Sequence, residues 1–99
     1  MKKARRVFSA VERGSPTSMK KALAAVSDGT RLKMLCLLVG CEKCACVLPK
    51  RVGTSQPAVS QHLKVLREAG LVRMRKDGKK RIYSLTGKGK KILADISSW

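Results

Sequence analysis

The sequence predicts an α+β fold that is mainly helical, with about five helices and one two-stranded β-hairpin. Apolar residues recur at three- and four-residue spacing in several separate segments, which is the period of an amphipathic helix. Two short segments flank Asp77-Gly78, a dipeptide typical of a tight hairpin turn. The chain has 99 residues, of which 43% are hydrophobic, so it fits one domain with a packed core.

The first part of the chain is predicted to be helical. Residues 1–13 are expected to form a basic amphipathic helix or arm. A second helix is expected over about 19–27, because apolar residues recur there at helical spacing. Either Asp28 or Thr30 can cap the third helix, which is expected over about 31–39.

A short helix over about 48–52 and a longer one from Ser55 to Ala69 follow. The turn between them is Gly53-Thr54. Ser55 is a good N-cap, and Pro57 falls in the first turn, where its missing N–H costs little. These two helices are expected to form a helix-turn-helix.

The remaining segments are predicted to be a hairpin and a last helix. Residues 71–76 and 80–85 are the two strands, and Thr86 caps the final helix. Helices, a polar-faced helix, a basic hairpin and a last helix occur here in the order of a winged helix-turn-helix.

The charge of the chain points to a polyanionic partner. Lys plus Arg number 23 against 6 acidic residues, which gives a net charge of +17. Nine basic residues and one acidic residue lie between positions 71 and 91, so this charge is concentrated on the hairpin and the segment after it. A single His and six carboxylates argue against an enzyme. The three aromatic residues argue against binding single strands by base stacking.

We expect a cytoplasmic protein without a membrane role. No apolar run is long enough to span a bilayer, and no apolar segment follows the basic N-terminus as in a secretory signal. In that compartment the four cysteines are expected to be thiols rather than structural disulfides.

Three segments of the sequence resemble the ArsR/SmtB family of bacterial and archaeal repressors. They are 27–35 (SDGTRLKML), 55–72 (SQPAVSQHLKVLREAGLV) and the Cys44-Ala45-Cys46 motif, and the resemblance covers about 19–96. It implies a homodimer, built from the terminal helices, that binds a palindromic operator in double-stranded DNA and releases it when an inducer binds. Residues 1–18 would then be an arm that contributes to dimerisation.

Residues 19–99 would form the DNA-binding domain. The resemblance makes Gln56, Ser60 and Gln61 the expected base readers. For His62, base readout and a packing or phosphate contact remain equal alternatives. The complete set of expected DNA-contacting residues is Ser55, Gln56, Pro57, Ser60, Gln61, His62, Lys64, Arg75, Lys76, Lys79, Lys80 and Arg81.

Pro49 determines how the cysteines are interpreted. Because Pro49 has no N–H for the Ala45 carbonyl, a helix is expected to begin only near residue 47 or 48. Cys41, Cys44 and Cys46 then lie in a loop or a loose first turn, where they can converge. Three thiolates form a soft site suited to As(III), Sb(III), Cd(II), Pb(II), Cu(I) or Zn(II).

The match to the family's arsenic site is partial. Pro49 stands where arsenic-responsive members carry a third Cys, so Cys41 would have to supply it. The family's other metal site is rejected, because the last helix offers Asp95 and no His. Cys41 and Cys44 could instead form a redox-sensing disulfide. Cys36 is interpreted as a core thiol.

The leading hypothesis is therefore a sequence-specific repressor whose DNA affinity changes when a soft metal or metalloid binds the cysteines. Two alternatives stay open. One is a repressor that switches through a disulfide, and the other is a non-sensing, architectural basic protein. A thiol enzyme is disfavoured, because no βαβ pattern surrounds the cysteines.

Overall fold

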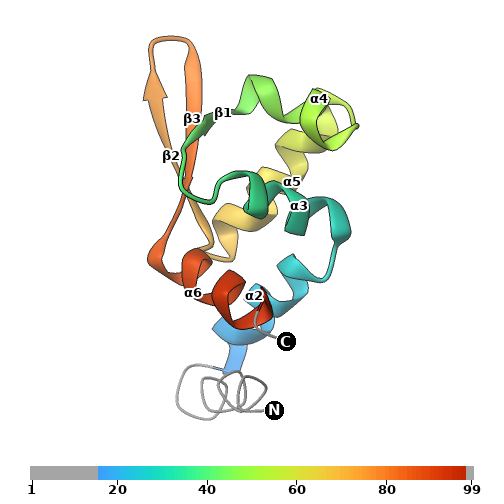
Figure 1. Cartoon of the computed structure of the whole chain (residues 1–99), viewed down its shortest axis with the longest axis vertical. Helices are drawn as coiled ribbons and strands as arrows, with labels where there is room; N and C mark the ends of the chain where they lie inside the picture. Colours follow the sequence, from blue (N-terminus) through green and yellow to red (C-terminus); the bar gives the residue numbers. More distant parts are fainter. Residues whose placement is uncertain (1–15, 98–99) are drawn as a thin grey trace.

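The computed structural model describes residues 16–97, so the predicted arm or helix over 1–13 lies outside the described residues. In this part of the chain, five α-helices pack beside a small antiparallel sheet, which confirms the predicted winged helix-turn-helix (Figure 1). In chain order the elements are α2 (Pro16–Val26), α3 (Gly29–Leu37), β1 (Lys43–Cys44), the 3₁₀ turn η1 (Ala45–Val47), α4 (Leu48–Val52), α5 (Gln56–Glu68), β2 (Val72–Asp77), β3 (Lys80–Leu85) and α6 (Gly87–Ser97).

The first two described helices start earlier than predicted. Helix α2 is described from Pro16, and a proline is tolerated in the first turn of a helix because it loses no hydrogen bond there. Helix α3 begins at Gly29, and Asp28 is its cap: the Asp28 side chain accepts a hydrogen bond from the Arg31 N–H at 3.0 Å. Thr30 lies inside the helix and is not the cap.

The core lies between the helices and the base of the hairpin. Helix α5 buries Val59, Leu63 and Leu66, which are spaced four and three residues apart on one face. The largest fully buried side chains are Met34, Leu35, Leu48, Leu63, Leu66, Leu71 and Val59. Burying a Leu stabilises a fold by about 1.5–3 kcal/mol, so this one cluster holds α5 in place.

The sheet has a strand that the sequence analysis did not predict. Its order is β1-β3-β2 with antiparallel pairing throughout. Strand β1 places Lys43 opposite Tyr83 and Cys44 opposite Ile82. A strand of two residues has no periodicity of its own, so its existence depends on pairing with a distant segment. The prediction that the three cysteines lie in a loop or loose turn is therefore wrong for Cys44, which lies in β1. It is confirmed for Cys41, which lies outside the helices and strands, and for Cys46, which lies in η1.

The hairpin turn is one residue later than predicted. Strand β2 continues to Asp77, which pairs with Lys80, so the loop consists of Gly78 and Lys79. Gly78 has a φ of 62° and Lys79 has no positive φ. That combination suits a type II′ turn, which takes Gly at its first central position.

Helix α6 is tied to the base of the hairpin. The Thr86 hydroxyl donates to the Gly70 carbonyl at 2.6 Å and accepts from the Gly89 N–H at 3.0 Å. A Cβ atom at Gly89 would lie 2.2 Å from the Leu71 carbonyl oxygen. The close approach of α6 therefore requires glycine at this position.

Candidate nucleic-acid interface

The turn between α4 and α5 is fixed by local hydrogen bonds. Gly53 takes the left-handed conformation, with a φ of 73°, and donates its N–H to the Pro49 carbonyl at 2.8 Å. Thr54 donates to the same carbonyl at 3.1 Å. The Ser55 hydroxyl then caps α5 by accepting from the Ala58 N–H at 3.3 Å. The predicted helix-turn-helix, with Ser55 as the cap, is confirmed.

Helix α5 has an apolar face toward the core and a polar face toward solvent. Ser60, Gln61 and Lys64 share the polar side, because three- and four-residue spacing places side chains above one another on a helix. Most of the predicted contact residues on and before this helix are exposed: Ser55, Gln56, Pro57, Ser60, Gln61 and Lys64. Glutamine and serine side chains of this kind can reach base edges in the major groove.

His62 differs from the other predicted residues of α5, because it is half-buried. One Arg31 guanidinium nitrogen, Nη1, lies 3.4 Å from His62 Nδ1, which can accept the hydrogen bond when it carries no proton. The same guanidinium donates to the carbonyls of Ala24 and Ala25 at 3.4 Å and 2.8 Å. His62 therefore lies at the junction of α2, α3 and α5, which supports the packing interpretation over base readout.

The hairpin, which we call the wing (72–85), projects beyond the helices (Figure 1). All of its predicted contact residues are exposed: Arg75, Lys76, Lys79, Lys80 and Arg81. Arg73 of the wing is exposed as well, and so are Lys50 and Arg51 of α4, just before the turn between α4 and α5. Together they make eight exposed basic side chains on the wing and near this turn. The sequence-based prediction did not include Lys50 and Arg51. A basic pair just before the turn of a helix-turn-helix does indicate a phosphate contact.

Arg75 is engaged by a carboxylate. Its Nε donates to Glu42 Oε2 at 3.3 Å, and its Nη2 contacts Glu42 Oε1 in an exposed ion pair. The hydrogen bonds from Arg75, together with its charge, hold the pKa of Glu42 below its usual value of 4.5. The same contact raises the pKa of Arg75. Glu42 lies in the segment between the cysteines and far from Arg75 in sequence, so no local pattern indicated this pair.

The cysteines lie beside this ion pair. The sulfur atoms of Cys44 and Cys46 are joined in a disulfide, and the Cys46 N–H lies 3.2 Å from Cys44 Sγ. The free Cys41 thiol is exposed and points to the Glu42 carbonyl at 3.3 Å. Within residues 16–97, no group of three side chains is gathered that could hold a metal ion. The structure pairs Cys44 with Cys46 and leaves Cys41 free, so the expectations of four thiols and of a Cys41–Cys44 disulfide are both corrected.

The interpretation of Cys36 as a core thiol is wrong, because its side chain is exposed. Helix α3 buries Met34 and Leu35, and Cys36 is about 200° around the helix from Met34. Its apolar neighbours in sequence are spread around the helix and did not reveal which face is buried.

Among the helices of the described residues, none is both long and apolar enough to cross a bilayer.

Comparison with known proteins agrees with the geometry. Residues 28–74 match the family described as "Bacterial regulatory protein, arsR family". The chain is 33% identical over 82 residues to a cadmium resistance transcriptional regulatory protein CadC homolog of Staphylococcus aureus, covering 82% of this chain and 68% of that protein. It is 46% identical over 63 residues to an arsenical resistance operon repressor of the same species, covering 64% of this chain but only 61% of that repressor's length.

A solved structure supports the same assignment. HlyU from Vibrio cholerae superposes with a TM-score of 0.77 at 32% identity, covering 85% of this chain and 92% of that one. These matches therefore assign the chain, with its Cys-x-Cys motif, helix-turn-helix and wing, to a family of regulators and not of enzymes. The chain belongs to the arsR family of bacterial regulatory proteins.

Proposed function

We propose that the protein is a sequence-specific transcriptional repressor that binds double-stranded DNA. The observation that carries this proposal is the exposed polar face of α5, flanked by the basic wing. A recognition helix enters the major groove, and basic residues beside it neutralise phosphates. The names of the two Staphylococcus aureus relatives support the regulatory role.

The contacts divide into two classes. Gln56, Ser60 and Gln61 read base edges, while the Lys and Arg side chains of the wing contact phosphates. Lys50 and Arg51 join the second class, because the first helix of a helix-turn-helix crosses the DNA backbone. The α5 residues supply choice of sequence, and the basic residues supply general affinity.

We also propose that two copies form a homodimer on a palindromic operator. Helices α2 and α6 lie at the same end of the molecule, away from the wing tip (Figure 1). This end is where an arm over 1–18 would join the domain over 19–99. A two-fold dimer presents two α5 helices to half-sites about one helical turn apart.

Selection from a random duplex library, followed by competition, tests the repressor proposal. We expect the selected duplex to bind roughly 10³-fold more tightly than random duplex at physiological salt. Gln61→Ala should reduce this ratio, whereas Arg81→Gln should weaken both duplexes by a similar factor. Equal binding of selected and random duplex would instead favour an architectural protein.

The cysteines are proposed to modulate DNA affinity through their redox state. Cys44 lies in β1, which pairs with β3 of the wing. A change in the bonding of the Cys44 sulfur can therefore alter the position of the wing. The two thiols lose two protons and two electrons when they form the disulfide. A low-molecular-weight disulfide supplies the oxidant by thiol–disulfide exchange and leaves as two thiols. The oxidised protein, with Glu42 held on Arg75, is expected to bind DNA more weakly.

A soft metal or metalloid such as As(III) or Cd(II) is the second candidate inducer. Reduction of the disulfide would give two thiolates suited to soft ions. A three-coordinate site also needs a third sulfur donor, but Cys41 does not converge with Cys44 and Cys46 in the structure. Redox control is therefore the favoured form of the proposal.

Gel-shift titrations separate these possibilities. Wild type, Cys44→Ser and the matched control Cys41→Ser are each titrated after treatment with dithiothreitol, oxidised glutathione, As(III) or Cd(II). Redox control predicts a several-fold affinity change in wild type and Cys41→Ser that is absent in Cys44→Ser. A response to As(III) that needs both Cys41 and Cys44 would favour the metalloid. No response to any treatment would refute a sensing role.

A further inference from the structure

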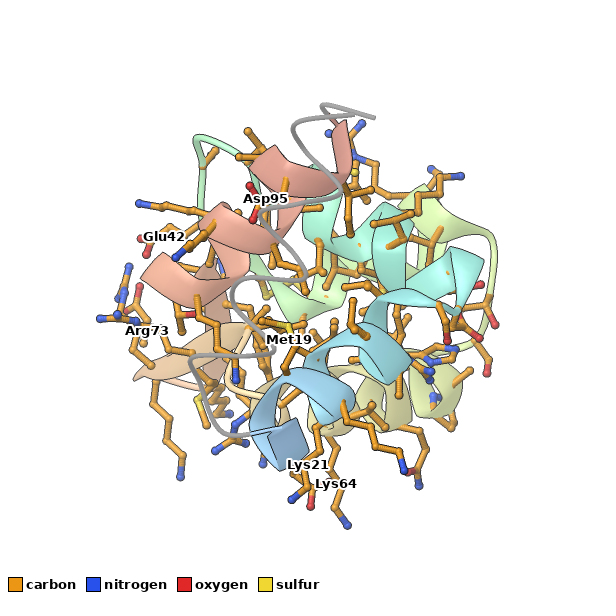
Figure 2. All side chains as sticks on the ribbon, turned by 90° about the horizontal axis from the view of Figure 1, so that it is seen from below. Met19, Lys21, Glu42, Lys64, Arg73 and Asp95 are labelled. Carbon is orange, nitrogen blue, oxygen red and sulfur yellow. A yellow bond between two sulfur atoms is a disulfide. The ribbon has the colours of Figure 1, made fainter. Side chains whose placement is uncertain are left out.

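Lys21 lies on α2, a helix that packs against α5. Helix α2 buries Ala22, Ala25 and Val26, and Lys21 is about 40° around the helix from Ala25, at the border of that buried face. Its side chain is exposed. Viewed along the long axis of the molecule, the side chains of Lys21 and Lys64 project toward the same edge (Figure 2). The two helices also contact one another.

Lys64 connects this edge to the DNA-reading surface. It follows Ser60 by four residues and Gln61 by three, so all three share one side of α5. Within residues 16–97, no ion pair occupies the ammonium groups of Lys21 and Lys64, and Glu68 is the one acidic residue on α5. The exposed side of α5 therefore continues onto α2. No carboxylate of the described residues neutralises Lys21 or Lys64 along this surface.

We propose that Lys21 is a further phosphate-contacting residue, which extends the DNA surface beyond α5 on the side away from the wing tip. This inference rests on the proposed DNA-binding function. A helix in the major groove is flanked by a phosphate backbone on each side. The wing reaches one side, and Lys21 with Lys64 supplies cations to the other. The nearly neutral base-reading helix then lies between two cationic contacts.

The salt dependence of binding tests the proposal. Wild type and Lys21→Gln are titrated with random duplex and with the duplex selected above, at several salt concentrations. Loss of one phosphate contact reduces the slope of log K against log[salt] by about 0.9 per protomer. We expect affinity to fall by a similar factor on both duplexes, because a phosphate contact carries no sequence information.

Lys33→Gln is the matched control, since it removes the same charge from an exposed site. Lys33 is two residues after Arg31, about 200° around α3, whereas Arg31 points to His62 on α5. Lys33 therefore faces away from the proposed surface, and its slope should stay near that of wild type.

Two results would overturn the inference. One is an unchanged slope for Lys21→Gln. The other is an equal loss in Lys33→Gln, which would mean that net charge and not position sets the effect. Failure of the repressor proposal is recognised separately, because wild type would then show no preference for the selected duplex. Circular dichroism of both variants confirms that each is folded.

Discussion

Glu42 is predicted to restrain DNA binding by occupying Arg75. The Arg75 guanidinium forms two hydrogen bonds with the Glu42 carboxylate, and both side chains are about half exposed. DNA phosphates compete with that carboxylate for the same guanidinium. Replacing Glu42 with Gln removes the charge but keeps the size of the side chain, so Arg75 becomes free to contact a phosphate.

The expected magnitude follows from one added phosphate contact per protomer. Such a contact steepens the slope of log K against log[salt] by about 0.9. Between 50 and 200 mM salt, this slope corresponds to a further change in affinity of about 3.5-fold. Glu42→Gln should therefore bind random duplex more tightly than wild type, with an advantage at 50 mM that is about 3.5 times larger than at 200 mM for each protomer that contacts the duplex.

Fluorescence anisotropy on random duplex, over this range of salt, measures the effect. The double variant with Arg75→Gln is the decisive control, because Glu42→Gln should change nothing when Arg75 has no cation to release. If Glu42→Gln tightens binding equally in the presence and absence of Arg75, then the loss of a negative charge is responsible and the ion pair is not. No tightening at all would show that phosphate displaces Glu42 without cost.

Other predictions concern stability. In Gly89→Ala, the added Cβ is forced against a backbone carbonyl, which should lower the free energy of unfolding by about 1–3 kcal/mol. Thermal denaturation should show this as a fall in Tm of several degrees. Gly87→Ala is the control and should not lower Tm, because nothing lies near a Cβ at that position. Ser55→Ala removes the cap of α5 and should cost about 0.5–2 kcal/mol in denaturant titrations, and no loss would mean that the cap is dispensable. Hydrogen bonds from the Arg31 N–H and from Arg75 lower the pKa values of Asp28 and Glu42, respectively, so both carboxylates stabilise the fold fully above their ordinary values of 3.8 and 4.5 and lose that contribution as the pH falls through the lowered values. Acid titrations of Asp28→Asn should therefore show a shallower loss of stability than wild type, and identical curves would contradict this assignment.

Elements with local signals were predictable from the sequence. The helix-turn-helix depends on Gly53, Ser55 and the spacing of apolar residues in α5, all within a short stretch. The wing depends on two adjacent strands and a glycine turn. Its turn was misplaced by one residue, because Asp77 and Gly78 were both assigned to the loop, whereas Asp77 pairs with Lys80.

Features that depend on distant residues were not predictable. Strand β1 exists only because Lys43 and Cys44 meet β3, and the Glu42–Arg75 pair joins segments that are 33 positions apart. Cys41, Cys44 and Cys46 are close together along the chain, but their spacing does not indicate that Cys44 is held in β1 or that it pairs with Cys46.

The pairing of β1 with β3 also has a consequence for the order of folding. Lys43 and Tyr83 are forty positions apart, while the wing strands and the two helices of the helix-turn-helix are neighbours in sequence. Closing a long loop carries an entropic cost that local contacts avoid, so β1 is expected to dock after the wing has formed. The cysteine segment would thus be the last part of the sheet to assemble and the first to detach. Its thiols would be most open to exchange during synthesis and local unfolding, before the regulator can act on DNA.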